Sequence, residues 1–172
     1  FHLYRGHRDP EARLVLVGSD AGFERYRVGL DRLIARLGTR GVTFAGRVSD
    51  AERDRWYADA DAYLCLSVHE GFCAPPVEAM AHAVPVVARR AGAVPETLGG
   101  AGVVIDGELA LAAEALHEVV SCESTRAGLR AAGRVRLEQL APTAVAARLR
   151  AALAPVLDRL SYTSATADDL PR

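Results

Sequence analysis

The sequence predicts an α/β fold in which a Rossmann-like parallel sheet carries helices on both faces. Two observations predict it: short apolar runs alternate with segments of helical spacing, and the composition is that of a globular chain. Half of the 172 residues are apolar and a quarter are charged, so the chain can bury a core. Strands that alternate with helices imply right-handed crossovers, which cover both faces of a parallel sheet.

Short apolar or β-branched runs predict the strands. The first run, RLVLVGS, is nearly all apolar between its ends and suits a strand that is buried on both faces. The predicted strands are residues 13–19 (RLVLVGS), 42–45 (VTFA), 62–66 (AYLCL), 85–88 (PVVA) and 102–105 (GVVI).

Spacing, caps and prolines predict the helices between these strands. Apolar residues recur at helical spacing over residues 22–37, and Gly38 follows as a stop signal. Ser49, followed three residues later by Glu52, is a capping-box pattern that predicts the start of the next helix. Residues 75–76 (PP) can open a third helix, because proline lacks only a donor that the first turn does not use.

From residue 108 onward the pattern is helical only, which predicts a helical extension after the sheet. The predicted helices are residues 108–120, 124–140 and 142–160. Residues 126–159 hold seven arginines against two acidic residues, and we interpret this surplus as a solvated helical face rather than a binding patch. We predict one domain over residues 1–160 and a polar, loosely held tail over 161–172.

Charge and length exclude several classes of partner. The net charge of −1 gives no electrostatic reason to expect nucleic acid or a membrane surface. Every basic residue is arginine, so the chain supplies no lysine for a Schiff base or a phosphate loop. The longest run without Asp, Glu, Lys or Arg, residues 79–88, is too short to span a membrane, and no signal peptide is visible.

The cysteines and histidines predict neither disulfides nor a metal site. Cys65, Cys73 and Cys122 are odd in number and form no C-x-x-C pair, so we expect no disulfide framework. We therefore expect the protein to be located in the reducing cytoplasm. The histidines have no metal-binding spacing, and we expect no metal and no cofactor.

The start of the chain predicts an upstream extension. Its first residue is Phe1 rather than Met, and residues 1–12 look like the last turn of a helix that runs into a turn. In an α/β domain such a helix follows a strand. We therefore expect the natural polypeptide to extend upstream of Phe1.

The segment 67–80 (SVHEGFCAPPVEAM) carries the candidate chemistry. Glu70 follows a predicted strand at its carboxyl end, where open α/β sheets bind ligands. Residues 71–74 precede a helix, so their N–H groups can converge on an anion, and Gly71 allows close approach. Glu78, early in that helix, can accept hydrogen bonds from sugar hydroxyls. This layout suits a nucleotide sugar. Alternatively, Glu70 is a plain loop charge and Glu78 complements the helix dipole.

The sequence resembles the retaining nucleotide-sugar glycosyltransferases of family 4, which have the GT-B fold of two Rossmann-like domains. The match covers roughly residues 12–106 and implies the carboxy-terminal, donor-binding domain. The matching strings, in the family's order, are LVLVG (14–18), VTFAGRVSDAE (42–52), YADADAYLCLSVHEGFCAPPVEAMA (57–81), PVVA (85–88) and GAVPETLGGAGVVID (92–106).

The resemblance implies a role for each matching residue. Glu70 would be the catalytic residue, facing the donor sugar near its anomeric carbon, and Glu78 would hold the ribose hydroxyls. The implied backbone donors to sugar and diphosphate are Gly71, Phe72, Cys73 and Ala74. The remaining implied donor-binding residues are Gly18, Arg47, Val48, Ser67 and His69. Arg47 and Val48 would contact the nucleobase. For His69 a structural role is an equal alternative.

Two departures from the family pattern affect this prediction. Cys73 stands where many members carry Gly, and a role for it as nucleophile is not expected because no basic partner adjoins it. The family's donor domain opens with a central strand and an Arg/Lys loop that neutralises the diphosphate, and this chain begins after both. We therefore expect the first strand to be missing and these residues alone to be inactive.

The resulting prediction is the donor-binding domain of a retaining glycosyltransferase that moves a sugar from a nucleoside diphosphate sugar to a hydroxyl acceptor. The expected partners are the nucleotide sugar and the missing acceptor-binding domain, through which the protein could reach a membrane surface. A non-catalytic nucleotide-sugar-binding or assembly module is the alternative. A coincidental match on a receiver-like domain is a third, which predicts an acidic cluster where only Asp20 is present.

Overall fold

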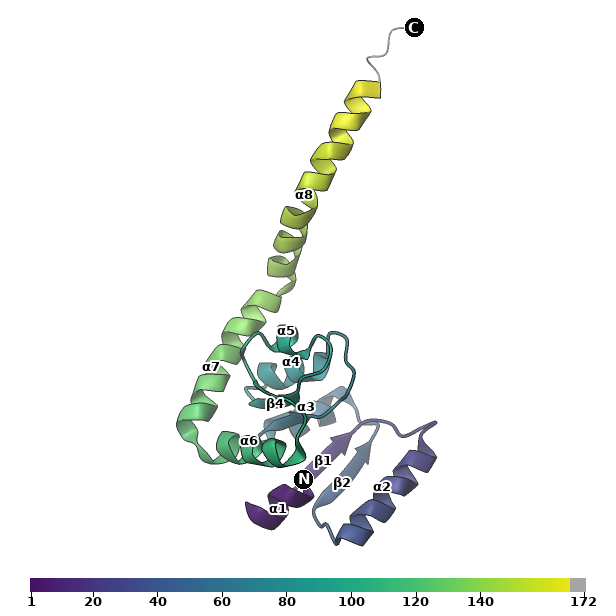
Figure 1. The fold of residues 1–172 in the computed structure, drawn as a ribbon, viewed down its shortest axis with the longest axis vertical. Helices are drawn as coiled ribbons and strands as arrows, with labels where there is room; N and C mark the ends of the chain where they lie inside the picture. Colours follow the sequence, from purple (N-terminus) through teal and green to yellow (C-terminus); the bar gives the residue numbers. More distant parts are fainter. Residues whose placement is uncertain (168–172) are drawn as a thin grey trace. The chain divides into compact units, whose positions relative to one another are not determined.

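All strands of the described chain lie in the first of two compact units, Phe1–Arg134 and Val135–Arg172 (Figure 1). The computed structural model describes residues 1–167, and side chains over residues 1–157 and at Arg159. The strands are all parallel to their neighbours. This confirms the predicted α/β class with parallel strands. The donor-binding domain predicted over residues 1–160 stays a prediction.

The first two strands form a separate parallel pair. β1 (Leu14–Val17) pairs with β2 (Val42–Gly46), and α2 (Glu24–Leu37) forms the crossover between them. Gly38 ends α2 in the left-handed conformation with φ +61, as predicted. The expectation that β1 is buried on both faces is wrong: Leu16 and Val17 are 41% and 42% exposed. Within residues 1–167, β1 pairs with β2 alone, so one of its edges is uncovered.

The other three strands form the better-buried sheet, in the order β3–β4–β5. They are β3 (Tyr63–Cys65), β4 (Val86–Arg89) and β5 (Val103–Ile105). Val86, Val87 and Ala88 of the central strand are fully buried. α4 (Ala74–Ala81) contacts β3 and β4, while α6 (Leu109–Ser121) contacts β4 and β5. Figure 1 shows these two helices on opposite sides of β4, as the fold class requires.

One short helix was not predicted from the sequence. α5 (Val94–Leu98) follows β4, carries a proline in its first turn and ends at Gly99 in the left-handed conformation. It is little more than one turn long, so it has no apolar periodicity to detect. Val94 and Leu98 are nonetheless fully buried, which anchors α5 in the core.

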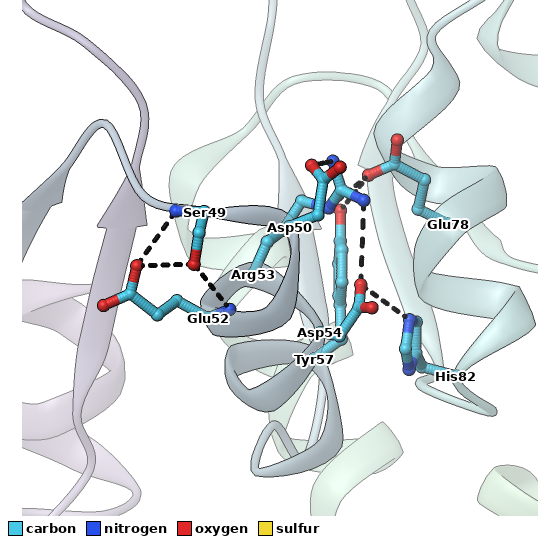
Figure 2. A network of polar contacts seen from close by, with 8 residues as sticks. All are labelled: Ser49, Asp50, Glu52, Arg53, Asp54, Tyr57, Glu78 and His82. Atoms are coloured by element: carbon cyan, nitrogen blue, oxygen red, sulfur yellow. Dashed lines mark hydrogen bonds and ion pairs between the residues drawn. The ribbon is translucent and has the colours of Figure 1, made fainter.

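The remaining helices agree with the sequence apart from their ends. They are α1 (His2–His7), α3 (Asp50–Ala58), α7 (Glu123–Leu140) and α8 (Pro142–Ala167). The predicted capping box begins α3: the Glu52 N–H donates to Ser49 Oγ at 3.3 Å, and the Ser49 N–H donates to Glu52 Oε2 at 2.9 Å (Figure 2). α8 continues past the predicted end at 160, and residues 168–172 of the predicted tail lie outside the described residues.

The helices were compared with the length and apolar composition of a membrane span. No single helix among the described residues is long and apolar enough to cross a membrane, although the bent pair formed by α7 and residues 142–157 passes on length and composition alone.

A cleft of about 510 Å³ lies between the two groups of strands. It is lined by the whole of β1 on one side and by Tyr63 and Leu64 of β3 on the other. Over residues 1–167, β3 pairs only with β4, just as β1 pairs only with β2. Each of these strands therefore presents an unpaired edge, and the cleft runs between elements that a continuous sheet would join.

Candidate functional site

The candidate site is built on the loop between β3 and α4. Glu70 is half-buried in this loop, and the neighbouring Gly71 and Phe72 are exposed. Ser67 is half-buried and His69 is exposed at the start of the loop. The loop leaves the carboxyl end of β3 beside the carboxyl end of β4, which is where the sequence predicted a ligand site.

The loop is held from behind by the segment that follows β4. The Ala93 N–H donates to the Glu70 carbonyl at 3.4 Å, and Thr97 Oγ1 donates to the Phe72 carbonyl at 2.6 Å. A Cβ on Gly92 would lie 2.0 Å from the Glu70 carbonyl oxygen, so only glycine fits there. Sequence reasoning missed both Gly92 and Thr97 as site residues, although both lie in the string GAVPETLGGAGVVID.

The bend at residues 71–74 leaves backbone amides without protein acceptors. Cys73 caps α4 in the left-handed conformation, with φ +57 and ψ +70, and its side chain makes no capping hydrogen bond. Within the described chain, the N–H groups of residues 71–74 donate to no protein group. The prolines that follow, residues 75–76, have no N–H. The N–H groups of the bend therefore carry the partial positive charge at the amino end of α4, and such a group of donors can bind an anion.

One cysteine of this bend lies close to a cysteine of β3. Cys65 of β3 and Cys73 are both buried, and their sulfur atoms lie 3.9 Å apart. Burial, followed by the nearby Cys65 and Glu70, raises the pKa of Cys73 to about 12. A protonated thiol is a poor nucleophile, which agrees with the expectation that Cys73 does not attack the substrate.

Glu70 completes a cluster with these two cysteines. Its carboxylate oxygen and the two sulfur atoms all lie within 4.8 Å of one another. Neither a C-x-x-C pair nor a histidine motif predicts this cluster, because its ligands come from a strand and from two positions in the loop that follows it. The available signal in the sequence was a cysteine in a predicted strand, Cys65, followed eight residues later by Cys73 in the candidate ligand loop.

Glu78 lies at the middle of α4 and faces α3. Its Oε2 accepts a hydrogen bond from the Tyr57 hydroxyl at 3.1 Å and lies 3.7 Å from Arg53 Nε (Figure 2). Burial, and then the Glu78 carboxylate, raises the pKa of Tyr57 well above its usual value, so this hydroxyl remains a donor. Arg53 was not identified from the sequence. The capping box was the available signal, because it predicts a helix over this segment. Within a helix, Arg53 and Tyr57, which are four residues apart, lie on the same face.

An aromatic contact joins α3 to β3 beside Glu78. Tyr57, which binds Glu78, lies beside Tyr63 with ring centroids 6.0 Å apart. Burial raises the pKa of Tyr63, and Glu70 is among the smaller contributors to that shift. The contact between Tyr57 and Tyr63 thus links the helix that holds Glu78 to the strand that precedes the Glu70 loop.

The other predicted residues lie at the carboxyl ends of β1 and β2. The Gly18 N–H donates to the Gly46 carbonyl at 2.9 Å, which joins the two strand ends. Arg47 is exposed and Val48 is half-buried in the loop that leads into α3. No described contact joins these three residues to Glu70. The loop with Arg47 and Val48 leads directly into α3, and α3 carries Tyr57 and Arg53, the partners of Glu78.

Comparison with known proteins identifies relatives over most of the chain. Residues 2–122 match the family described as "Glycosyl transferases group 1". The MMP alpha-(1->4)-mannosyltransferase of Mycolicibacterium hassiacum is 42% identical over 73 residues, which are 42% of this chain and 18% of that protein. A GDP-mannose-dependent monoacylated alpha-(1-6)-phosphatidylinositol monomannoside mannosyltransferase of Corynebacterium glutamicum is 34% identical over 139 residues, 75% of this chain and 35% of that protein.

Solved structures share the fold. The carboxy-terminal domain of the group 1 glycosyltransferase LpcC from Francisella tularensis matches with a TM-score of 0.65 at 25% identity, over 80% of this chain and 73% of that one. HepE from Anabaena, in complex with UDP, matches with a TM-score of 0.71 at 25% identity, over 85% of this chain and 42% of that one. The chain spans at most about a third of the length of the two curated relatives above.

The contact between Gly92 and the Glu70 carbonyl generates a prediction about the loop. Gly92→Ala should destabilise the protein by well over the roughly 1 kcal/mol expected for alanine at a positive φ, because its Cβ also collides with the carbonyl. Gly100→Ala is the matched control, since Gly100 has φ +86 and open space around its Cβ. Urea unfolding of both variants measures the difference. Equal losses in the two variants would show that the loop does not depend on this contact.

Proposed function

The chain belongs to the group 1 glycosyltransferase family, as its resemblance predicts, and we propose that it forms the donor-binding part of a retaining enzyme that transfers a hexose from a nucleoside diphosphate sugar to a hydroxyl acceptor. The observation that carries this proposal is the set of unpaired amides at residues 71–74, flanked by two carboxylates. The fold is that of the carboxy-terminal domain of a GT-B enzyme.

In this proposal the diphosphate binds at the bend before α4. The amides of residues 71–74 lie at the amino end of α4 and have no acceptor within the described part of the chain. Such amides stabilise the negative charge that grows on a leaving diphosphate, without a metal ion. The UDP complex of the Anabaena relative supports a nucleoside diphosphate as the ligand.

Glu78 is proposed to hold the ribose. Its Oε2 is engaged by Tyr57 and Arg53, and no described donor contacts Oε1. The fixed carboxylate can thus accept hydrogen bonds from ribose hydroxyls through its second oxygen. The predicted base-binding residues, Arg47 and Val48, lie in the loop before the helix that carries those two partners, so base and ribose would bind next to each other.

Glu70 is proposed to face the donor sugar. Glu70 precedes the bend in the sequence and Glu78 follows it, so in this proposal the two carboxylates flank the diphosphate. A carboxylate there stabilises the positive charge that develops at the anomeric carbon as the diphosphate leaves. Ser67 and His69, which precede it, would line the same crevice. The mannosyltransferase activity named for the two curated relatives supports a hexose donor.

We further propose that an apolar strand from outside these residues fills the cleft between β1 and β3. Both strands present unpaired edges to the cleft, and the exposed side chains of Leu16 and Val17 lie on its β1 side. The proposed occupant is a strand of the same polypeptide, because the chain spans at most about a third of the length of its two curated relatives. Its addition would join the two groups of strands into one parallel sheet and support both sides of the nucleotide site.

The ribose assignment predicts a loss of nucleotide affinity. Glu78→Ala in the whole protein should weaken the binding of UDP, GDP or ADP, whichever binds, by about 10-fold or more, because a charged acceptor of hydroxyl hydrogen bonds is lost. Isothermal titration calorimetry measures this. Glu108→Ala is the control, since Glu108 is exposed and makes no capping hydrogen bond. Unchanged affinity in the Glu78 variant would refute the ribose role.

The proposed role of Glu70 predicts a different phenotype. Glu70→Gln should lower kcat for sugar transfer by about 100-fold or more, because the amide cannot stabilise developing positive charge. The affinity for the nucleoside diphosphate alone should stay within about 2-fold, since Glu70 contacts the sugar rather than the nucleotide. Steady-state kinetics and calorimetry on one preparation test both. Transfer at the unmodified rate would contradict an enzymatic role for Glu70 and favour the alternative of a binding module.

The proposed additional strand predicts slower hydrogen exchange at the cleft. In the whole protein, amides of β1 and β3 should exchange on the order of 100-fold more slowly than in the isolated 172-residue chain. The amides of β4, which already has two partners, serve as the internal control. If β1 and β3 exchange equally fast in both proteins while β4 is protected, no strand occupies the cleft.

A further inference from the structure

A second kind of ligand chemistry is present beneath the donor loop. Cys65, Glu70 and Cys73 offer two sulfur atoms and one carboxylate oxygen, all within 4.8 Å of one another. Both cysteines are buried, whereas Glu70 is half-buried and its neighbours Gly71 and Phe72 are exposed. The ion pairs of residues 1–157 include Glu78 but not Glu70, so no described cation balances this cluster.

The spacing of the two sulfur atoms matches one coordination geometry closely. Two thiolates bound to tetrahedral Zn²⁺ at about 2.3 Å lie about 3.8 Å from each other. The Cys65 and Cys73 sulfur atoms are 3.9 Å apart in the structure, so they need almost no movement to bind such an ion. A disulfide would instead require the sulfur atoms to approach to about 2.05 Å, and it would leave Glu70 without a role.

We propose that Cys65, Glu70 and Cys73 form a binding site for a thiophilic divalent cation of the Zn²⁺ type. Two thiolates and a carboxylate are suitable ligands for this ion, and their donor set disfavours Mg²⁺ and Ca²⁺, which prefer oxygen ligands. Each cysteine gives up its thiol proton to solvent when the ion binds. The three protein ligands leave the fourth position of a tetrahedral ion for water.

Such a site would regulate the proposed transferase. This consequence rests on the proposed function, since it requires that Glu70 faces the donor sugar. A carboxylate bound to the cation beside the two sulfur atoms cannot at the same time stabilise charge at the anomeric carbon. Zn²⁺ therefore acts as an inhibitor of sugar transfer.

The site itself is tested by binding, apart from any activity. The whole, reduced protein is titrated with Co²⁺, which replaces Zn²⁺ and gives near-ultraviolet charge-transfer absorption when thiolates bind it. We expect this band in the wild type and in the control Cys122→Ser, whose cysteine lies outside the cluster. We expect its loss in Cys65→Ala and Cys65→Ser, together with a fall in Zn²⁺ affinity on the order of 100-fold or more. A wild-type protein without the band overturns the proposal.

Two further results separate the site from folding and from the proposed function. UDP or GDP affinity, measured on the Cys65 variants, shows that they are folded, and a loss of the Co²⁺ band in a variant that still binds nucleotide supports the site. A band that is equally strong in Cys65→Ala and Cys122→Ser overturns it. Zn²⁺ should inhibit sugar transfer by the wild type and by Cys122→Ser but not by Cys65→Ala. Equal inhibition of all three proteins would contradict the regulatory role of the site, and unchanged nucleotide affinity in the same proteins would leave the proposed function standing.

Discussion

The site depends on one constrained bend of the backbone, at residues 70–74. Gly92 lets the chain after β4 approach the Glu70 carbonyl, and Thr97 binds the Phe72 carbonyl from the buried helix α5. With these two carbonyls held, the N–H groups of residues 71–74 have no acceptor among the described residues. The left-handed conformation of Cys73 then passes the chain into α4. The proposed diphosphate site, the position of Glu70 and the thiol cluster all follow from this arrangement.

The two carboxylates owe their different surroundings to the elements on either side of that bend. Glu78 is fixed by Tyr57 and Arg53 of α3, whose start is set by the capping box at Ser49. Among the described residues, Glu70 has no such partner and instead adjoins the two sulfur atoms. A fixed carboxylate suits recognition of a constant part of the donor, the ribose. A carboxylate that can contact either a sugar or a cation suits a residue whose activity is regulated.

The sequence was sufficient where the signal is local. The capping box predicted the start of α3, the proline pair predicted the start of α4, and the rule for carboxyl ends of parallel strands predicted the position of Glu70. It was not sufficient where the cause is a contact between distant segments. The closeness of Gly92 to Glu70 and of Cys65 to Cys73 depends on how β3 and β4 pair, and the exposure of Leu16 depends on what lies beside β1. No periodicity encodes such contacts.

A crystal structure of the whole protein with a bound nucleoside diphosphate tests the central claim most directly. The account predicts phosphate oxygens within about 3 Å of backbone nitrogens in residues 71–74, with the ribose hydroxyls against Glu78. A nucleotide whose phosphates bind elsewhere on the protein, while these amides remain without an acceptor, would contradict it.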